Sequence, residues 1–234
     1  MTNRSDALLE KIYENGCAHD EVTSDASRQM LNITPSTGCF LDLLVTETKS
    51  KRVLELGTSN GYTTIWLGRA AARFGGKVMS VEYLPSKVAL AAKNVSDAEL
   101  SGTVELRMLN IGKFLKSTAD KSFDFVFLDA DHSHYVRWWQ DIRRVLDFGM
   151  LVVNNATSHD TQLQPFIDSL QSDDEFEHQI FDIGKGQLVV RRAWDPLSDE
   201  LRTLIGDVGA WTALDSNGVG NGVGNLGAVA KLLP

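Results

Sequence analysis

Short apolar segments alternate with longer amphipathic segments along most of the chain. From residue 52 to about residue 192, runs of strand length rich in Val, Leu and Phe are separated by stretches with apolar residues at helical spacing. Continuous apolar runs predict strands buried on both faces, and their alternation with helices is typical of a parallel sheet. We therefore expect an α/β fold with strands at 52–57, 77–82, 103–109, 123–129, 150–155, 177–183 and 187–193.

The last two predicted strands are separated only by a short segment that contains Gly184, Lys185 and Gly186. A connection this short joins antiparallel strands in a hairpin, because parallel neighbours need a long crossover. We therefore predict one antiparallel strand near the edge of the sheet.

The two ends of the chain lie outside this alternation. Residues 24–48 carry two helical patterns separated at Pro35, and Ser36 is placed to cap the second of them. Residues 216–227 are rich in Gly and Asn, which predicts flexibility, although the apolar end after them can instead dock on a neighbour. We expect an N-terminal helical layer (1–48), a main domain (49–194) and a partly flexible C-terminal tail (195–234).

The composition is that of a globular protein, with 43% hydrophobic and 23% charged residues. The net charge of -8 argues against nucleic-acid binding, which depends on clustered Lys and Arg, and favours small-molecule partners. No apolar run is long enough for a membrane span, and the first 16 residues lack the apolar run of a secretory signal. We therefore expect a cytoplasmic protein without a membrane partner.

Two pairs of residues give expectations about burial. Cys17 and Cys39 have no metal-ligand spacing and are interpreted as unpaired thiols in the core, on helices, which agrees with a reducing compartment. Trp138 and Trp139 follow the fourth predicted strand on a helix, where adjacent side chains point about 100° apart. We expect one of these tryptophans in the core and the other near solvent or a subunit contact.

A glycine-containing turn follows the first predicted strand, in the sequence VLELGTSNGYTTIWLG (53–68). Ligands of open α/β sheets bind beyond the carboxyl ends of the strands. Small residues such as Gly57, Ser59 and Gly61 let a ligand approach the backbone and meet the free amides of the next helix. The spacing differs from the G-x-G-x-x-G of nicotinamide-binding folds and from the phosphate-binding loop of nucleoside triphosphatases. The turn therefore predicts a ligand site without identifying the ligand.

Two acidic residues end the first two predicted strands, Glu55 two positions before Gly57 and Glu82 on the next strand. A carboxylate near the cleft repels a pyrophosphate and attracts a sulfonium and an ammonium group, which S-adenosylmethionine carries. Glu82 is placed to accept hydrogen bonds from both hydroxyls of its ribose. Either acid alone is interpreted by default as a solvated charge at a strand end. Together with the turn, the two acids favour S-adenosylmethionine over a nicotinamide dinucleotide.

These residues, with 30–45 (MLNITPSTGCFLDLLV) upstream and 123–135 (FDFVFLDADHSHY) downstream, resemble the class I S-adenosylmethionine-dependent methyltransferases. Within that fold the sequence looks most like the catechol and caffeoyl-CoA O-methyltransferase-like family, from about residue 28 to residue 193. The resemblance implies a Rossmann-like three-layer sandwich around a mostly parallel seven-stranded sheet. The implied strand order is 3-2-1-4-5-7-6, with strand 7 antiparallel, and 49–194 becomes an S-adenosylmethionine-binding methyltransferase domain.

The resemblance also implies roles for individual residues. Glu55, Gly57, Tyr62 and Thr63 would line the methionine end of the cofactor, Glu82 its ribose and Asn110 its adenine. An Asn after a strand is nearly as common in a plain turn, so Asn110 has both interpretations. The full set of predicted cofactor-binding residues is Glu55, Gly57, Ser59, Gly61, Tyr62, Thr63, Glu82, Asn110 and Asp129.

In the family, a divalent cation is held by the first Asp of a D-A-D stretch and by an Asp-Asn pair at the next strand tip. These positions are Asp129, Asn154 and Asn155 here, so the pair reads Asn-Asn and one carboxylate is lost. Because Mg²⁺ gains much of its affinity from carboxylates, we expect a weakened or absent cation. Asp131 can compensate only if its side chain turns into the cleft.

His132 stands three residues after Asp129, where enzymes of the family often place a lysine. Histidine titrates near neutral pH and can take a phenolic proton, so His132 and Asp129 are the predicted catalytic residues. A structural imidazole bonded to nearby backbone is the alternative for His132. His134 and His159 are further candidates for the base.

The sequence thus predicts an O-methyltransferase that uses S-adenosylmethionine and acts on a small hydroxylated, aromatic acceptor. A metal-independent methyltransferase with another small acceptor and a non-catalytic cofactor-binding module stay open, whereas Glu55 disfavours a nicotinamide oxidoreductase. We also expect a homodimer. Met30, Ile33 and Phe40 of the N-terminal layer can form the dimer face, cap the cofactor or simply pack in the core.

Overall fold

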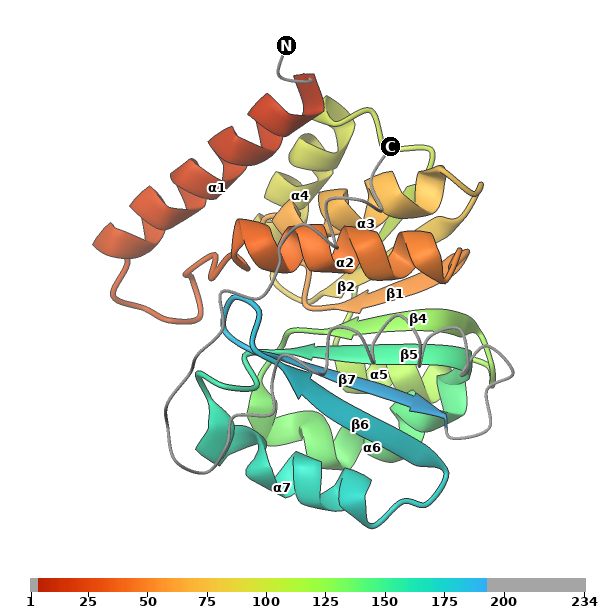
Figure 1. Ribbon diagram of the computed structural model, residues 1–234. Coiled ribbons are helices and arrows are strands. Elements are labelled where there is room, and N and C mark those ends of the chain that lie inside the picture. Colours follow the sequence, from red (N-terminus) through yellow and green to blue (C-terminus); the bar gives the residue numbers. More distant parts are fainter. Residues whose placement is uncertain (1–3, 193–234) are drawn as a thin grey trace, which may run out of the picture. The chain divides into compact units, whose positions relative to one another are not determined.

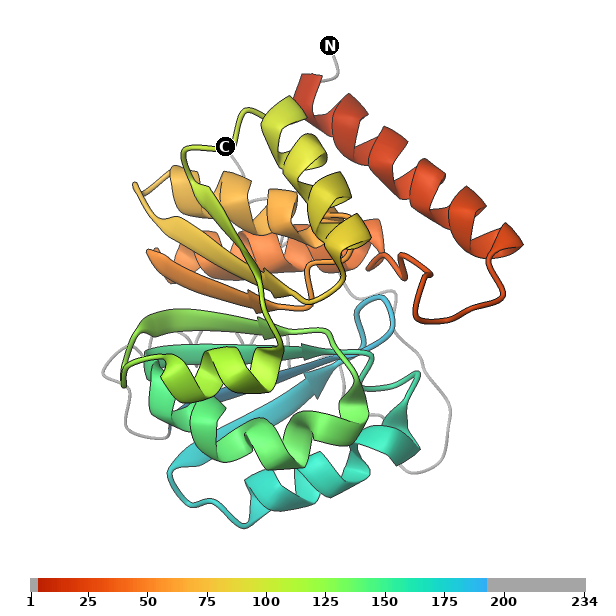
Figure 2. The same ribbon diagram turned by 180° about the vertical axis from the view of Figure 1, so that it is seen from behind.

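A seven-stranded sheet with helices on both faces forms the centre of the fold (Figures 1 and 2). The computed structural model describes residues 4–192. The strand order is β3-β2-β1-β4-β5-β7-β6, and all neighbours pair in parallel except β7, which is antiparallel to β5 and β6. The strands are β1 (Arg52–Leu56), β2 (Lys77–Glu82), β3 (Val104–Met108), β4 (Phe123–Leu128), β5 (Leu146–Asn154), β6 (Phe176–Phe181) and β7 (Gln187–Arg192). The predicted fold class, strand order and terminal hairpin are confirmed.

The helices are distributed over the two faces according to the direction in which the chain crosses the sheet. The chain winds from β1 outward to β3, returns to β4 beside β1, and then winds outward in the other direction. Helices α2 (Pro35–Glu47), α3 (Tyr62–Ala72) and α4 (Pro85–Asp97) lie on one face, and α1 (Arg4–Val22) packs on α3. The other face is covered by α5 (Ile111–Ser117), α6 (Tyr135–Val145) and α7 (Asp160–Gln171). The strand order reverses between β1 and β4, the place where open α/β sheets bind ligands.

The N-terminal layer differs from the prediction in its first half. Residues 24–34 do not form a helix: α1 ends at Val22, and turns and a loop connect it to α2. The carboxylate of Asp20 holds this loop, because it accepts hydrogen bonds from the backbone amides of Met30 (2.6 Å) and Leu31 (2.8 Å). A side chain that bonds the backbone in this way competes with helix formation.

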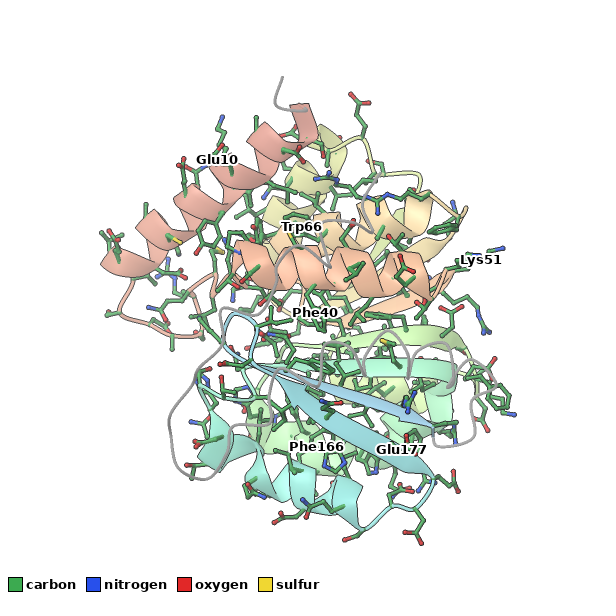
Figure 3. The ribbon with its side chains drawn as sticks, in the orientation of Figure 1. Glu10, Phe40, Lys51, Trp66, Phe166 and Glu177 are labelled. Atoms are coloured by element: carbon green, nitrogen blue, oxygen red, sulfur yellow. The ribbon has the colours of Figure 1, made fainter. Side chains whose placement is uncertain are left out.

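The cap of α2 is Thr34 and not Ser36. Pro35 occupies the first helical position, where its missing N–H costs nothing, so the preceding residue becomes the cap. The Thr34 hydroxyl accepts from the amide of Thr37 at 3.2 Å. Figure 3 labels Phe40 on α2 and Trp66 on α3, and the ring of Phe40 contacts that of Phe181 at the end of β6, with centroids 5.7 Å apart and planes tilted by 44°.

Both tryptophans of α6 are buried, against the expectation that one would face solvent. Trp138 is 5% exposed and Trp139 is 3% exposed. Helix α6 lies between α5 and α7. The side chains of Trp138 and Trp139 point about 100° apart, and protein covers both directions. Trp139 packs edge-on against Phe166 of α7, labelled in Figure 3, and its indole N–H donates to Asp173 at 3.2 Å.

The two cysteines are on α1 and α2 as expected and are unpaired, but both are exposed and not in the core. No helix within residues 4–192 is long and apolar enough to cross a membrane. The C-terminal tail predicted for 195–234 lies outside the described residues.

Candidate active site

A cleft of about 470 Å³ opens at the carboxyl ends of the strands, where the strand order reverses. The cleft is lined by the loop before α2, by the turn after β1 and by the segments that follow β2, β4 and β5. The lining includes Met30 and Leu31 from the loop, Gly57, Ser59 and Thr63 from the turn and α3, Glu82 and Lys87 near β2, and Asp129, His132, Asn155, His159 and Lys185 on the far side.

Gly57 brings the backbone of the turn directly against the end of β4. Its φ is 108°, and a Cβ atom added there would lie 2.0 Å from the carbonyl oxygen of Asp129. Gly61, with φ of 83°, caps α3 and would contact the backbone of Ala91. The two glycines therefore permit a close approach that residues with side chains would block.

Replacing Gly57 with alanine is expected to lower the free energy of unfolding by about 2–4 kcal/mol, because Ala meets both a strained φ and a backbone atom. Gly75 is the matched control. It also has a positive φ, of 67°, but nothing lies within 4 Å of an added Cβ, so Gly75→Ala should cost about 1 kcal/mol. Urea unfolding of both variants measures the difference, and equal stability of the two would contradict the role of the contact.

Glu82 ends β2 with its carboxylate fixed by backbone amides. Its Oε2 accepts from Ser59 (3.1 Å), and its Oε1 accepts from Tyr83 (2.8 Å) and Leu84 (3.0 Å). The residue is 8% exposed and lines the cleft. Each carboxylate oxygen has more than one acceptor position, so Glu82 can still receive hydrogen bonds from a ligand hydroxyl.

Glu55 does not line the cleft, which differs from the expected direct contact with a ligand. Side chains alternate along β1, so Leu54 and Leu56 point toward α5 and α6, and Glu55 points toward the layer that holds α3. Its Oε2 accepts from the hydroxyls of Thr64 and Ser80, both at 2.5 Å. Burial is the main cause that raises the pKa of Glu55 to about 8, so the side chain is mostly protonated at neutral pH.

Stability is therefore expected to fall as pH rises from the ordinary Glu pKa of 4.5 toward 8, since the folded state retains a proton that the unfolded state releases. Between these two pH values, the free energy of unfolding of Glu55→Gln should change by at least about 1 kcal/mol less than that of the wild type. Denaturant unfolding between these pH values tests it, with Glu105→Gln on the exposed side of β3 as the control. Parallel stability profiles for wild type and Glu55→Gln would show that Glu55 is charged when folded.

The other predicted cofactor residues divide into two groups. Ser59 and Thr63 line the cleft, and the Ser59 hydroxyl donates to the carbonyl of Met30 at 2.6 Å, which ties the loop to the turn. Tyr62 is buried against the ring of Tyr13 (centroids 5.5 Å) and does not line the cleft. Asn110, which also does not line it, caps α5 by accepting from the Lys113 amide at 3.2 Å.

Asp129 follows β4 and faces the cleft. Burial raises its pKa to about 6, against the opposing effects of a hydrogen bond with Asn154 and of the nearby His132, Lys185 and Lys87. Asp131 also lines the cleft, but its Oδ1 accepts from the Ser133 amide at 3.0 Å and caps the short 3₁₀ helix η1 (His132–His134). The acceptor side of the cleft thus has one buried carboxylate, Asp129, and one exposed carboxylate, Asp131.

Two of the predicted cation ligands, Asn154 and Asn155, are adjacent in the chain, but only Asn155 lines the cleft. Asn154 is buried, and its Oδ1 accepts from Gln187 Nε2 at 2.8 Å. The same Gln187 atom lies 3.3 Å from the carbonyl oxygen of Ile183. Because a carbonyl oxygen only accepts hydrogen bonds, this atom of Gln187 must be the NH₂ nitrogen. The oxygen of Asn154 is thereby engaged, and its NH₂ group is left for Asp129. Among the described residues, no three His, Cys, Asp or Glu side chains are grouped so as to hold a metal ion.

His132 and Asn155 both carry buried polar atoms without a partner. His132 Nδ1 lies 3.0 Å from Gln162 Oε1, while its Nε2 has no hydrogen-bond partner. Asn155 adopts a left-handed backbone with φ of 68°, and its buried Oδ1 also has no partner. His159 lies next to His132, with ring centroids 5.1 Å apart, and His134 points to Arg137 (3.1 Å) and does not line the cleft.

Sequence reasoning missed Leu31, Lys87, Lys185 and Gln162. Leu31 enters the cleft because the segment expected to be helical is a loop. Lys185 had a usable signal, since it lies between two glycines of a tight hairpin at the same end of the sheet as Asp129. Burial lowers the pKa of Lys87, against the effect of Glu82, and no pattern in the chain indicates this residue. Gln162 becomes visible only through its contact with His132.

The chain matches the O-methyltransferase family over residues 12–193. It is 33% identical over 184 residues to the catechol O-methyltransferase of Mycobacterium tuberculosis, covering 74% of this chain and 81% of that protein. It is also 33% identical over 140 residues to the catechol O-methyltransferase of Niastella koreensis, covering 58% of this chain and 63% of that protein. The O-methyltransferase from Bacillus cereus in complex with SAH has a TM-score of 0.66 at 21% identity, covering 80% of this chain and 91% of that one.

Proposed function

The chain belongs to the O-methyltransferase family and is an S-adenosylmethionine-dependent methyltransferase, and we propose that its acceptor is a small aromatic molecule with adjacent hydroxyl groups. We further propose that His132 removes the acceptor proton and that no divalent cation is required. The two relatives described above are named as catechol O-methyltransferases, which agrees with this acceptor class.

Two unpartnered acceptor atoms carry the proposal for the substrate. His132 Nε2 and Asn155 Oδ1 belong to residues that line the same part of the cleft as Asp129, and neither has a donor. A buried acceptor without a partner costs about 1–3 kcal/mol, which a ligand donor can recover. Hydroxyl groups are such donors. Met30, Leu31 and Ile111 contribute apolar lining that suits an aromatic ring.

The residues at the other end of the cleft fit S-adenosylmethionine. The Gly57 turn leaves no space for a side chain and presents backbone to a ligand, and the Glu82 carboxylate can accept from ribose hydroxyls. This cofactor supplies a methyl group on a positively charged sulfur. Glu82 and Asp129, which both line the cleft, make it favourable for a cationic ligand, and Lys87 offsets part of that charge.

The protein has two tasks in the reaction. It holds the acceptor oxygen in line with the methyl carbon, and alignment of this kind can lower a barrier by roughly 7–11 kcal/mol. His132 Nε2 would take the proton as the O–H bond breaks, which would leave the acceptor oxygen as the nucleophile for the methyl group that S-adenosylmethionine would supply. The imidazolium then releases its proton to solvent.

Of the three residues that the resemblance assigns to a divalent cation, Asn154 does not fit this role, which leaves the Asp129 carboxylate and the Asn155 amide oxygen as the assigned oxygen ligands. Mg²⁺ needs oxygen ligands, but the oxygen of Asn154 is engaged by Gln187 and its NH₂ group is directed to Asp129. In place of a cation, an amide N–H stabilises the Asp129 carboxylate. A deprotonated acceptor oxygen must then be generated by a protein base.

A panel of acceptors tests the proposed function. Transfer of a labelled methyl group should be fastest to a benzene ring with two adjacent hydroxyls, slower to one with a single hydroxyl, and undetectable for an amine of the same shape. Each comparison uses the full chain and S-adenosylmethionine. Equal transfer to the amine and the diol would reject the proposed acceptor class.

The homodimer and the cytoplasmic location stay predictions. Light scattering of the purified chain measures the first, with twice the mass of 25.8 kDa expected.

A further inference from the structure

The side-chain oxygen of Gln162 contacts a ring nitrogen of His132. Gln162 lies on the first turn of α7, is itself exposed, and does not line the cleft. Its Oε1 is 3.0 Å from His132 Nδ1, across 30 residues of sequence. An amide oxygen only accepts hydrogen bonds, so this contact requires a hydrogen on Nδ1.

We propose that Gln162 is a positioning residue that fixes neutral His132 as the Nδ1–H tautomer and so leaves the lone pair of Nε2 free to accept the substrate proton. This inference rests on the proposed function for its catalytic consequence. The opposite tautomer would place a hydrogen on the buried Nε2, which has no partner, and would leave two acceptors facing each other at the Gln162 contact. Which nitrogen of a histidine carries the proton is set by the partner of the other nitrogen.

The contact is compatible with both states of the ring. When Nε2 takes a proton, Nδ1 keeps its hydrogen and continues to donate to Gln162, so no rearrangement is needed at that side. The ring is also held by an edge contact with Tyr135, with centroids 5.2 Å apart and planes at 90°. Tyr135 is fixed in turn, since its hydroxyl accepts from the Ala130 amide (2.8 Å) and donates to the Ala130 carbonyl (2.9 Å).

The backbone places Gln162 relative to the other acceptor-side residues. The carbonyl of Asn155 accepts from the amide of His159 at 3.0 Å, and the carbonyl of His159 accepts from the amide of Gln162 at 3.0 Å. One short segment thus connects Asn155, His159 and Gln162 at the start of α7. Because the Gln162 side chain is exposed, substituting it should leave the fold intact.

Nitrogen-15 NMR of the full chain with labelled histidine reads the tautomer directly, without substrate. Spectra are recorded at about pH 8.5, where histidine is neutral, and the His132 signals are assigned by their loss in His132→Asn. We expect a protonated Nδ1 and an unprotonated Nε2 in wild type and in Gln162→Glu, because a carboxylate also accepts. Gln162→Met should give a mixture that includes the Nε2–H form.

Kinetics of the same variants test the catalytic consequence. Gln162→Met should lower kcat about 10-fold with little change in KM, and Gln162→Glu should stay within about threefold of wild type at the same pH. Gln164→Met is the matched control, since Gln164 is exposed on the same helix and bonds Asp168 instead. It should change neither the spectrum nor kcat.

Two results would overturn the inference. One is an Nε2–H tautomer in wild type, which would mean that the Gln162 amide donates to the ring. The other is a Gln162→Met variant with unchanged tautomer or unchanged kcat. If wild type methylates no phenolic acceptor, the proposed function fails, and the NMR comparison alone then decides whether Gln162 sets the tautomer.

Discussion

Replacing His132 with asparagine is expected to lower kcat for methyl transfer by about 10²- to 10⁴-fold, the usual contribution of a positioned general base. Without Nε2 the acceptor hydroxyl keeps its proton, and a neutral hydroxyl is a poor nucleophile toward the methyl carbon. Binding of S-adenosylhomocysteine should change by less than about twofold, because the proposed cofactor contacts are at the other end of the cleft. Single-turnover assays and calorimetry measure the two effects separately.

His134→Asn is the control for this variant. His134 lies on the same short helix but contacts Ser133 and Arg137 and does not line the cleft, so its loss should leave kcat unchanged. A His132→Asn enzyme with near wild-type kcat would identify another base. His159 would then be the next candidate, since its pKa is lowered by burial and it is neutral at neutral pH.

Replacing Glu82 with alanine is expected to weaken binding of S-adenosylhomocysteine about 100-fold, which corresponds to about 2.7 kcal/mol. The carboxylate is proposed to accept from ribose hydroxyls, and it also holds the amides of Ser59, Tyr83 and Leu84, which shape the adjoining turn. Loss of the ribose contact and loss of the turn's support should both weaken binding of S-adenosylhomocysteine. Isothermal titration calorimetry measures the affinity.

Two further variants separate ligand binding from folding. Glu105→Ala removes an exposed acid of β3 that pairs with Arg107 on the same strand, and it should leave affinity unchanged. Glu82→Gln keeps the shape of the side chain but places an NH₂ group against backbone donors, so it should lose affinity almost as strongly as alanine. Wild-type affinity in Glu82→Ala would remove this residue from the cofactor site.

The sheet could be predicted because both local and long-range signals agreed. Apolar runs such as 123–129 identify strands buried on both faces, and the glycines at 184 and 186 require a hairpin. The N-terminal layer was harder, because the spacing of residues 24–34 suits a helix while Asp20, outside that segment, bonds the amides of Met30 and Leu31. A contact between separate segments cannot be read from periodicity alone.

The site was predicted at the level of strand ends but not of side-chain direction. Asp129, Glu82 and His132 were identified by position and all line the cleft. Glu55 was expected there too, but alternation along β1 turns it toward Thr64 and Ser80. The attraction of the cleft for a cationic ligand therefore depends on Glu82 and Asp129, because Glu55 is buried and mostly protonated at neutral pH.

The same limit applies to Asn154. The sequence shows that a carboxylate is missing, yet only the structure shows that the remaining amide oxygen is bonded to Gln187, a residue 33 positions later. Because the oxygen of Asn154 is bonded to Gln187, its NH₂ group faces Asp129 as a hydrogen-bond donor and the residue no longer offers an oxygen to a cation. Asn154→Asp restores the charge and should give the site a measurable affinity for Mg²⁺.

The dependence of methyl transfer on a divalent cation tests the central claim most directly. Initial rates are measured with purified enzyme and a dihydroxylated aromatic acceptor, after treatment with a chelator and again after addition of excess Mg²⁺, for wild type and Asn154→Asp. We predict that wild-type rates agree within about twofold under both conditions, while Asn154→Asp responds to Mg²⁺. Loss of wild-type activity with the chelator and its recovery with Mg²⁺ would contradict proton removal by His132 without a cation.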